Sequence, residues 1–191
     1  MKRYLKVLPV ILYPYAYMIW FAFLCVGSEA LEKVMESEKI GAAAIIIGIL
    51  YQFVVLADVI YTAVTTAVNQ YTAFDVAKLN LVIKAWQIPA YLLHFVLGVA
   101  GSLMSVWGIG IVLFAIVIDL ITILLTGSCA IGCVIKMKKQ NVLTTPLAVL
   151  AAIGSFVYCV DVVVAIVLVC VAKKKSAEDN TIQLQYRELE G

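Results

Sequence analysis

Long apolar runs that carry almost no charge are the feature that most constrains this chain. Hydrophobic residues make up 64% of its 191 residues and charged residues 14%, and the charges gather in the gaps between the runs. An ordinary soluble domain is about half apolar and about a quarter charged. A helix that faces lipid must be apolar along about 20 residues. The pattern therefore predicts an all-α fold, a polytopic membrane helical bundle.

Five apolar runs predict transmembrane helices, because a spanning helix needs about 20 residues at about 1.5 Å of rise each. They cover residues 5–26, 40–63, 86–105, 109–135 and 143–172. The third and fourth runs form one apolar stretch of about 50 residues, which is too long to cross a bilayer once and must fold back. Glycines cluster in its middle, so we expect the turn near residues 105–108.

The remaining segments complete a single bundle over residues 1–172. A mixed stretch at 72–85 has helical spacing of its apolar residues and predicts a short interfacial helix. The first run is longer than the core of a signal peptide and lacks a small-residue cleavage pattern, so it indicates a retained helix. Residues 173–191 are polar, and we expect a flexible tail there.

The orientation is weakly determined by charge. Five spans with the N-terminus inside place eight basic residues inside and six outside, a small bias under the positive-inside rule. An alternative with four spans makes 86–105 a re-entrant hairpin and gives nine against five. Five spans are preferred, because about 20 apolar residues are too few to enter and leave with every backbone group satisfied.

Several classes of function receive no support from the residues. The net charge of +2 gives no basis for a nucleic-acid partner. The sequence contains no zinc-protease, nucleophile-elbow, Walker or dinucleotide motif. One histidine excludes a His-rich metal site, and five cysteines in apolar runs indicate small buried hydrophobes. We expect no enzymatic activity, no cofactor and no metal, with the lipid bilayer and a homo-oligomer or a membrane protein as partners.

Four ionisable residues fall inside the apolar runs and define a candidate intramembrane polar site: Asp58, His94, Asp119 and Asp161. An aspartate at a helix centre costs about 2.5–3.5 kcal/mol on insertion scales unless it pairs, protonates or reaches water. Helical spacing places Thr122 on the face of Asp119, and Tyr158 on the face of Asp161. Small and polar faces pack inward in membrane bundles, so we expect these stripes to meet in a common interior.

Two hypotheses for these polar residues remain open. In the first, interhelical hydrogen bonds fix the bundle of a non-enzymatic integral membrane protein with an accessory or interaction role. In the second, the residues form a site for a proton, cation or small ligand in a small proton- or cation-coupled carrier or channel component. A pair between His94 and a carboxylate near mid-membrane would serve either hypothesis.

A set of short motifs occurs between residues 80 and 165. They are Asn80-Leu81, Lys84, Ile88-Pro89-Ala90-Tyr91, Gly108-Ile109-Gly110-Ile111, Asp119, Leu125-Thr126-Gly127 and Cys159-Val160-Asp161-Val162. In these motifs the chain resembles small, uncharacterised multi-pass bacterial membrane proteins. The resemblance implies an integral protein of the bacterial cytoplasmic membrane and supplies no activity.

Overall fold

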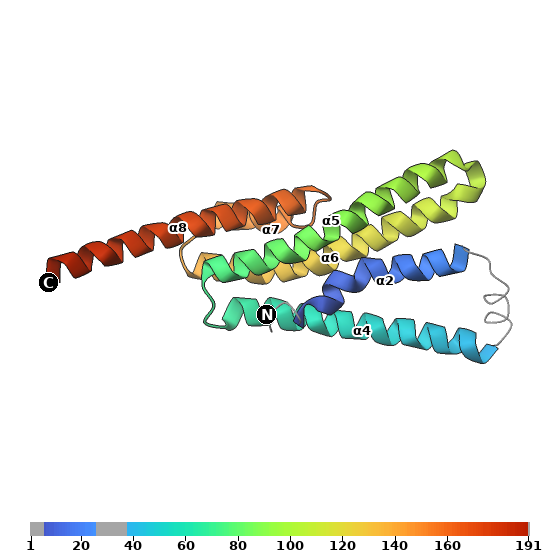
Figure 1. Ribbon diagram of the computed structural model, residues 1–191, viewed down its shortest axis with the longest axis horizontal. Helices are drawn as coiled ribbons and strands as arrows, with labels where there is room; N and C mark the ends of the chain where they lie inside the picture. The colour runs from blue at the N-terminus through green and yellow to red at the C-terminus, as the bar shows by residue number, and fades with distance from the viewer. Residues whose placement is uncertain (1–5, 26–37, 191) are drawn as a thin grey trace. The chain divides into compact units, whose positions relative to one another are not determined.

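The computed structural model describes residues 6–25 and 38–190, and this part of the chain is helical apart from short connections. Its helices are α2 (Leu8–Cys25), α4 (Glu38–Val68), α5 (Ala73–Leu103), α6 (Ile109–Lys139), α7 (Thr145–Gly154) and α8 (Val160–Glu190), with a 3-10 turn, η1 (Ser105–Gly108) (Figure 1). No strand occurs in the described segments. The predicted all-α class is confirmed.

Within residues 6–25 and 38–190, three helices, not five, are long and apolar enough to cross a membrane. They are Ile46–Val68, Ala73–Leu103 and Ile109–Lys139. The predicted number of five transmembrane helices is therefore wrong. Part of the first predicted span, 5–26, lies outside the described residues, and its described apolar helix, Leu8–Ala22, is short of the about 30 Å hydrocarbon thickness.

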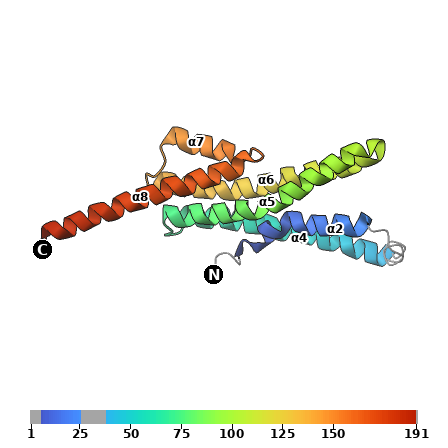
Figure 2. The ribbon, with the colours of Figure 1, turned by 45° about the horizontal axis from the view of Figure 1, so that its top comes forward.

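The predicted fifth span, 143–172, is broken into α7 and α8 by a turn at residues 155–159. Cys159 in this turn has a φ of 63°, a left-handed conformation that a right-handed helix cannot contain. The chain therefore reverses, and α7 packs alongside the first part of α8 (Figures 1 and 2). The uninterrupted apolar composition of this segment gave no sign of the reversal.

The predicted interfacial helix at 72–85 and the predicted span at 86–105 form one continuous helix, α5. Pro89 lies inside α5 without ending it, so the alternative of a re-entrant hairpin at 86–105 is also wrong. At the other end of the chain, α8 continues through the polar segment to Glu190, where a flexible tail was expected.

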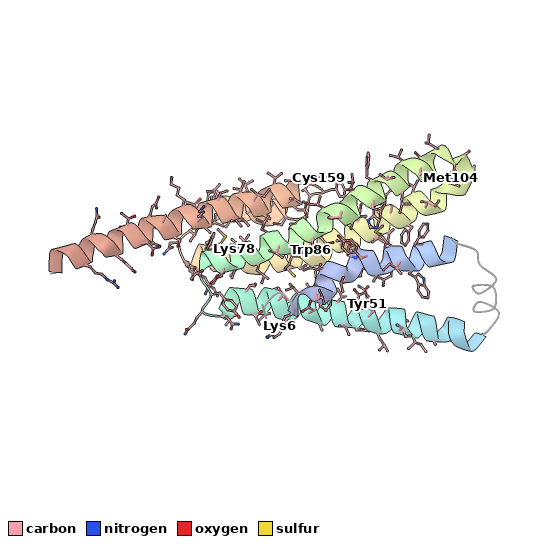
Figure 3. All side chains as sticks on the ribbon, viewed as in Figure 1. Lys6, Tyr51, Lys78, Trp86, Met104 and Cys159 are labelled. Carbon is pink, nitrogen blue, oxygen red and sulfur yellow. The ribbon has the colours of Figure 1, made fainter. Side chains whose placement is uncertain are left out.

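The turn expected near residues 105–108 is where η1 connects α5 to α6, next to Met104 (Figure 3). Ser105 has a φ of 58°, which reverses the chain direction after α5. A Cβ atom at Gly108 would overlap the backbone of Gly101, so only glycine permits this close approach.

The chain divides into two compact units. Unit 1 comprises Met1–Val59 and Gln87–Thr122, and unit 2 comprises Ile60–Trp86 and Ile123–Gly191. In unit 1, α2 and α4 are joined by hydrogen bonds from Tyr51 Oη to Pro9 O (3.1 Å) and from Tyr17 Oη to Gln52 Oε1 (3.2 Å). In unit 2, one buried core combines side chains from α5, α6, α7 and α8.

Candidate functional site

The predicted site residues fall into both units. Unit 1 contains Asp58, His94, Asp119 and Thr122, whereas unit 2 contains Asp161 and Tyr158. The structure brings His94 and Asp119 together, and it pairs Asp161 with a residue outside the predicted set, Lys84.

Lys84 of α5 forms the centre of a buried polar cluster in unit 2. Its Nζ lies 2.8 Å from Asp161 Oδ2, 2.7 Å from Thr126 Oγ1 and 3.2 Å from the Ser155 backbone oxygen. The side chains of Lys84 and Asp161 have no exposed surface. An ammonium group has three N–H donors, so these three acceptors account for all of them.

The turn between α7 and α8 creates the acceptors of this cluster. Ser155 follows the last residue of α7, where the partial negative charge of the helix dipole favours a cation. Asp161 lies in the first turn of α8, where the positive end of the dipole favours a carboxylate, and its Oδ1 accepts the Val162 N–H at 2.9 Å. The turn between α7 and α8 therefore supplies a carboxylate and a backbone carbonyl that both bind the Lys84 ammonium.

Lys84 was not among the predicted site residues, because it falls within residues 72–85, which were predicted to form an interfacial helix. Its partner was predicted to lie among apolar residues at membrane depth. The sequence did carry one usable signal: Lys84 borders an apolar run in which a lone cation would be costly, and Asp161 lies alone in another run. Two isolated opposite charges at such positions favour a pair.

His94 of α5 and Asp119 of α6 form a second pair, in unit 1. His94 Nδ1 and Asp119 Oδ1 lie 2.5 Å apart, and the ring of Phe114 lies edge-on to the imidazole at 6.5 Å between centroids. The His94 side chain is fully buried, and the Asp119 side chain keeps 15% of its surface exposed. The second ring nitrogen, His94 Nε2, has no hydrogen-bond partner among the described residues.

Asp58 of α4 lies at the beginning of α2. Its carboxylate accepts a hydrogen bond from the Val10 backbone N–H, which lies in the first turn of that helix. The first N–H groups of a helix lack partners within it, and an acid there is favourable for the helix dipole. Asp58 Oδ2 has no partner among the described residues.

Gln87 of α5 is a further buried polar residue that the prediction omitted. Pro14 lacks the N–H that would normally bond to the Val10 carbonyl four residues earlier. Gln87 Nε2 donates to that oxygen at 3.3 Å and so replaces the missing bond. Asp58 and Gln87 thus satisfy the two polar backbone groups of Val10.

The two other predicted residues have local surroundings of a different kind. Thr122 is buried, and its hydroxyl donates to the Ile118 oxygen of its own helix at 2.7 Å. Tyr158 is exposed in the turn between α7 and α8. Neither residue is a member of the Lys84–Asp161 pair or of the His94–Asp119 pair.

No group of three or more His, Cys, Asp or Glu side chains that could hold a metal ion occurs within residues 6–25 and 38–190. Comparison of the chain with protein-family models, with curated proteins and with solved structures finds no match.

Proposed function

We propose that the chain is a non-enzymatic integral membrane protein with an accessory or interaction role in the bacterial cytoplasmic membrane. The observation that carries this proposal is the Lys84 ammonium, whose three donors are used by Asp161, Thr126 and Ser155. These acceptors belong to α8, α6 and the end of α7, so the Lys84 side chain of α5 forms hydrogen bonds to three other segments. A saturated, fully buried ion pair has no free donor to offer a substrate.

The apolar surface of the long helices supports membrane insertion. Phe53 on α4 is 66% exposed, Leu92 on α5 64% and Leu124 on α6 57%. A soluble chain rarely leaves so many large apolar side chains uncovered, whereas lipid chains or a partner helix would cover them in a membrane.

A second candidate is a small proton-coupled carrier or channel component, and the orphan His94 Nε2 favours it. A neutral His94 that donates its Nδ1 proton to Asp119 keeps a lone pair on Nε2. Such a nitrogen can accept a proton, and the adjacent carboxylate stabilises the resulting charge. Intramembrane acid–histidine pairs are typical of proton relays.

Proton flux in proteoliposomes tests both proposals. The purified protein is reconstituted with a pH-sensitive dye inside the vesicles, and a potassium gradient with valinomycin supplies the driving potential. The accessory role predicts no flux above that of protein-free vesicles. The carrier role predicts a flux that His94→Gln and Asp119→Asn abolish and that Asp75→Asn, at an exposed acid in the first turn of α5, leaves intact.

A separate wash experiment tests the membrane location. Membranes from expressing cells are treated with alkaline carbonate, which removes peripheral proteins. We expect the chain to stay in the pellet; release into the supernatant would contradict both candidate functions.

A further inference from the structure

Helix α7 and the apolar part of α8, which precede and follow the reversal, are each too short to cross a membrane. Helix α7 has 10 residues and rises about 15 Å, and the apolar part of α8, residues 160–172, rises about 20 Å. The hydrocarbon core of a bilayer is about 30 Å thick. Neither helix could therefore cross this core on its own.

The packing of unit 2 places both ends of residues 145–172 in the same buried core. One buried core contains Leu143 before α7, Ala172 at the end of the apolar part of α8, Met137 near the end of α6 and Ala73 at the start of α5. The chain thus leaves the reversal beside the place where it entered.

Residues 155–157, the first part of the turn at the tip of the reversal, have backbone groups that bond to protein, as irregular backbone at membrane depth requires. Residues 157–160 of the turn are exposed. The Ser155 oxygen accepts from Lys84, and Ser155 Oγ donates to the Ala151 oxygen at 2.8 Å. The next two backbone N–H groups donate back into α7, from Phe156 to Ile153 at 3.0 Å and from Val157 to Gly154 at 3.2 Å.

The level at which the reversal begins and ends is basic. Five lysine side chains are exposed there: Lys78 at the start of α5, Lys138 and Lys139 at the end of α6, and Lys173 and Lys174 after the apolar part of α8. Three exposed acids lie near these lysines: Asp75 in α5, and Glu178 and Asp179 in α8. The two acids of α8 pair with Lys175, at 4.0 Å and 3.3 Å. Lysines collected at the ends of apolar helices match the anionic headgroups of the cytoplasmic leaflet.

We propose that residues 145–172 form a re-entrant hairpin that opens on one face of the membrane, and that the lysines on this face bind anionic phospholipid headgroups. The basic face of unit 2 at the open end of the hairpin, defined by Lys78, Lys138, Lys139, Lys173 and Lys174, lies on the cytoplasmic side. This inference goes beyond the proposed function but rests on its membrane location.

Lysine acylation on the unmodified chain tests the topology. Sealed right-side-out and inside-out vesicles are treated with a membrane-impermeant N-hydroxysuccinimide ester, and modified peptides are quantified by mass spectrometry. The hairpin requires that Lys138–Lys139 and Lys173–Lys174 react in the same vesicle preparation, the inside-out one. Reaction of the two pairs in opposite preparations means that 145–172 crosses the membrane, and overturns the inference.

Labelling by an impermeant maleimide of Asn141→Cys and Lys174→Cys, each made in a variant without the native cysteines, provides a second measurement. Labelling of both from one side agrees with the hairpin, and labelling from opposite sides contradicts it. A chain that alkaline carbonate releases from membranes contradicts the proposed function as well, whereas opposite-side labelling in a chain that stays in the membrane contradicts only the hairpin.

Lipid binding is measured by native mass spectrometry of the detergent-solubilised protein titrated with phosphatidylglycerol or phosphatidylcholine of equal chain length. We expect preferential retention of phosphatidylglycerol. The change Lys138→Gln/Lys139→Gln/Lys173→Gln/Lys174→Gln should weaken its apparent affinity by about 5-fold for each lysine removed. Arg187→Gln, which removes an exposed cation farther along α8, is the matched control and should bind as the wild type does. Equal retention of the two lipids, or wild-type affinity of the quadruple variant, overturns the headgroup site.

Discussion

The Lys84 ammonium and the Asp161 carboxylate lie 2.8 Å apart with no exposed side-chain surface on either residue. Removing two charges from water is costly, and their attraction in a low-dielectric interior offsets this cost only when the remaining donors are also satisfied. Thr126 and the Ser155 oxygen meet that condition. The pair joins α5 to the reversal between α7 and α8, so its loss should be felt across unit 2.

Lys84→Met should destabilise the protein by about 3–5 kcal/mol, because it leaves the Asp161 carboxylate buried without a counter-charge. Lys78→Met, on the same helix but exposed, is the control and should change the free energy of unfolding by less than about 0.5 kcal/mol. The measurement is reversible unfolding in mixed detergent micelles, followed by circular dichroism.

The double change Lys84→Met/Asp161→Leu should recover most of the stability lost in the single variant. Both charges are then absent, and the apolar replacements need no partners. A double variant as unstable as Lys84→Met would show that the lysine stabilises unit 2 through something other than its charge.

Gln87→Leu should cost about 1–3 kcal/mol, because the Val10 carbonyl loses the donor that replaces the absent N–H of Pro14. Pro14→Ala restores that N–H within α2. The same glutamine substitution should therefore cost less in the Pro14→Ala background, and a double-mutant cycle measures the coupling. Equal costs in the two backgrounds would separate Gln87 from the proline.

Gly132→Ala should destabilise unit 2 by about 1–3 kcal/mol through overpacking. A Cβ atom there would overlap the Ala63 backbone and the Thr66 hydroxyl, and so would push α4 away from α6. Gly110→Ala on the same helix meets no atom within 4 Å, so it should be neutral or stabilising by up to about 1 kcal/mol. Thermal denaturation of both variants in one detergent gives the comparison.

Cys159→Val should cost about 1–3 kcal/mol, because a β-branched side chain is strained at a φ of 63°. Glycine adopts this conformation freely, so Cys159→Gly should remain within about 1 kcal/mol of the wild type. Both variants remove the same thiol. Equal stability of the two would mean that the left-handed conformation is not required for the reversal.

The sequence was sufficient to predict the helical class and the place of one turn. Apolar runs interrupted by charges leave a helix as the main way to satisfy the backbone in lipid. The glycines between Gly98 and Gly110 marked the connection of α5 to α6, because only residues without a Cβ allow the contact between Gly101 and Gly108.

The sequence could not predict the reversal between α7 and α8, and it could not select Asp161 from the three aspartates in apolar runs as the partner of Lys84. Residues 155–159 carry no proline or charge, and the left-handed residue is a cysteine, so local composition resembles that of a continuous helix. The pairing of Lys84 with Asp161 depends on that reversal, because it brings Ser155 and Asp161 to the same ammonium. A continuous helix over residues 143–172 would not bring the Ser155 carbonyl and the Asp161 carboxylate to one ammonium group.

Helix α8 continues from its apolar half into its polar half without a break. Residues 173–190 therefore extend as a rod of about 27 Å. A water-soluble protein that bound the C-terminal end of α8 would lie up to this distance from the lipid surface. A fluorophore attached at that end would measure the distance to the membrane.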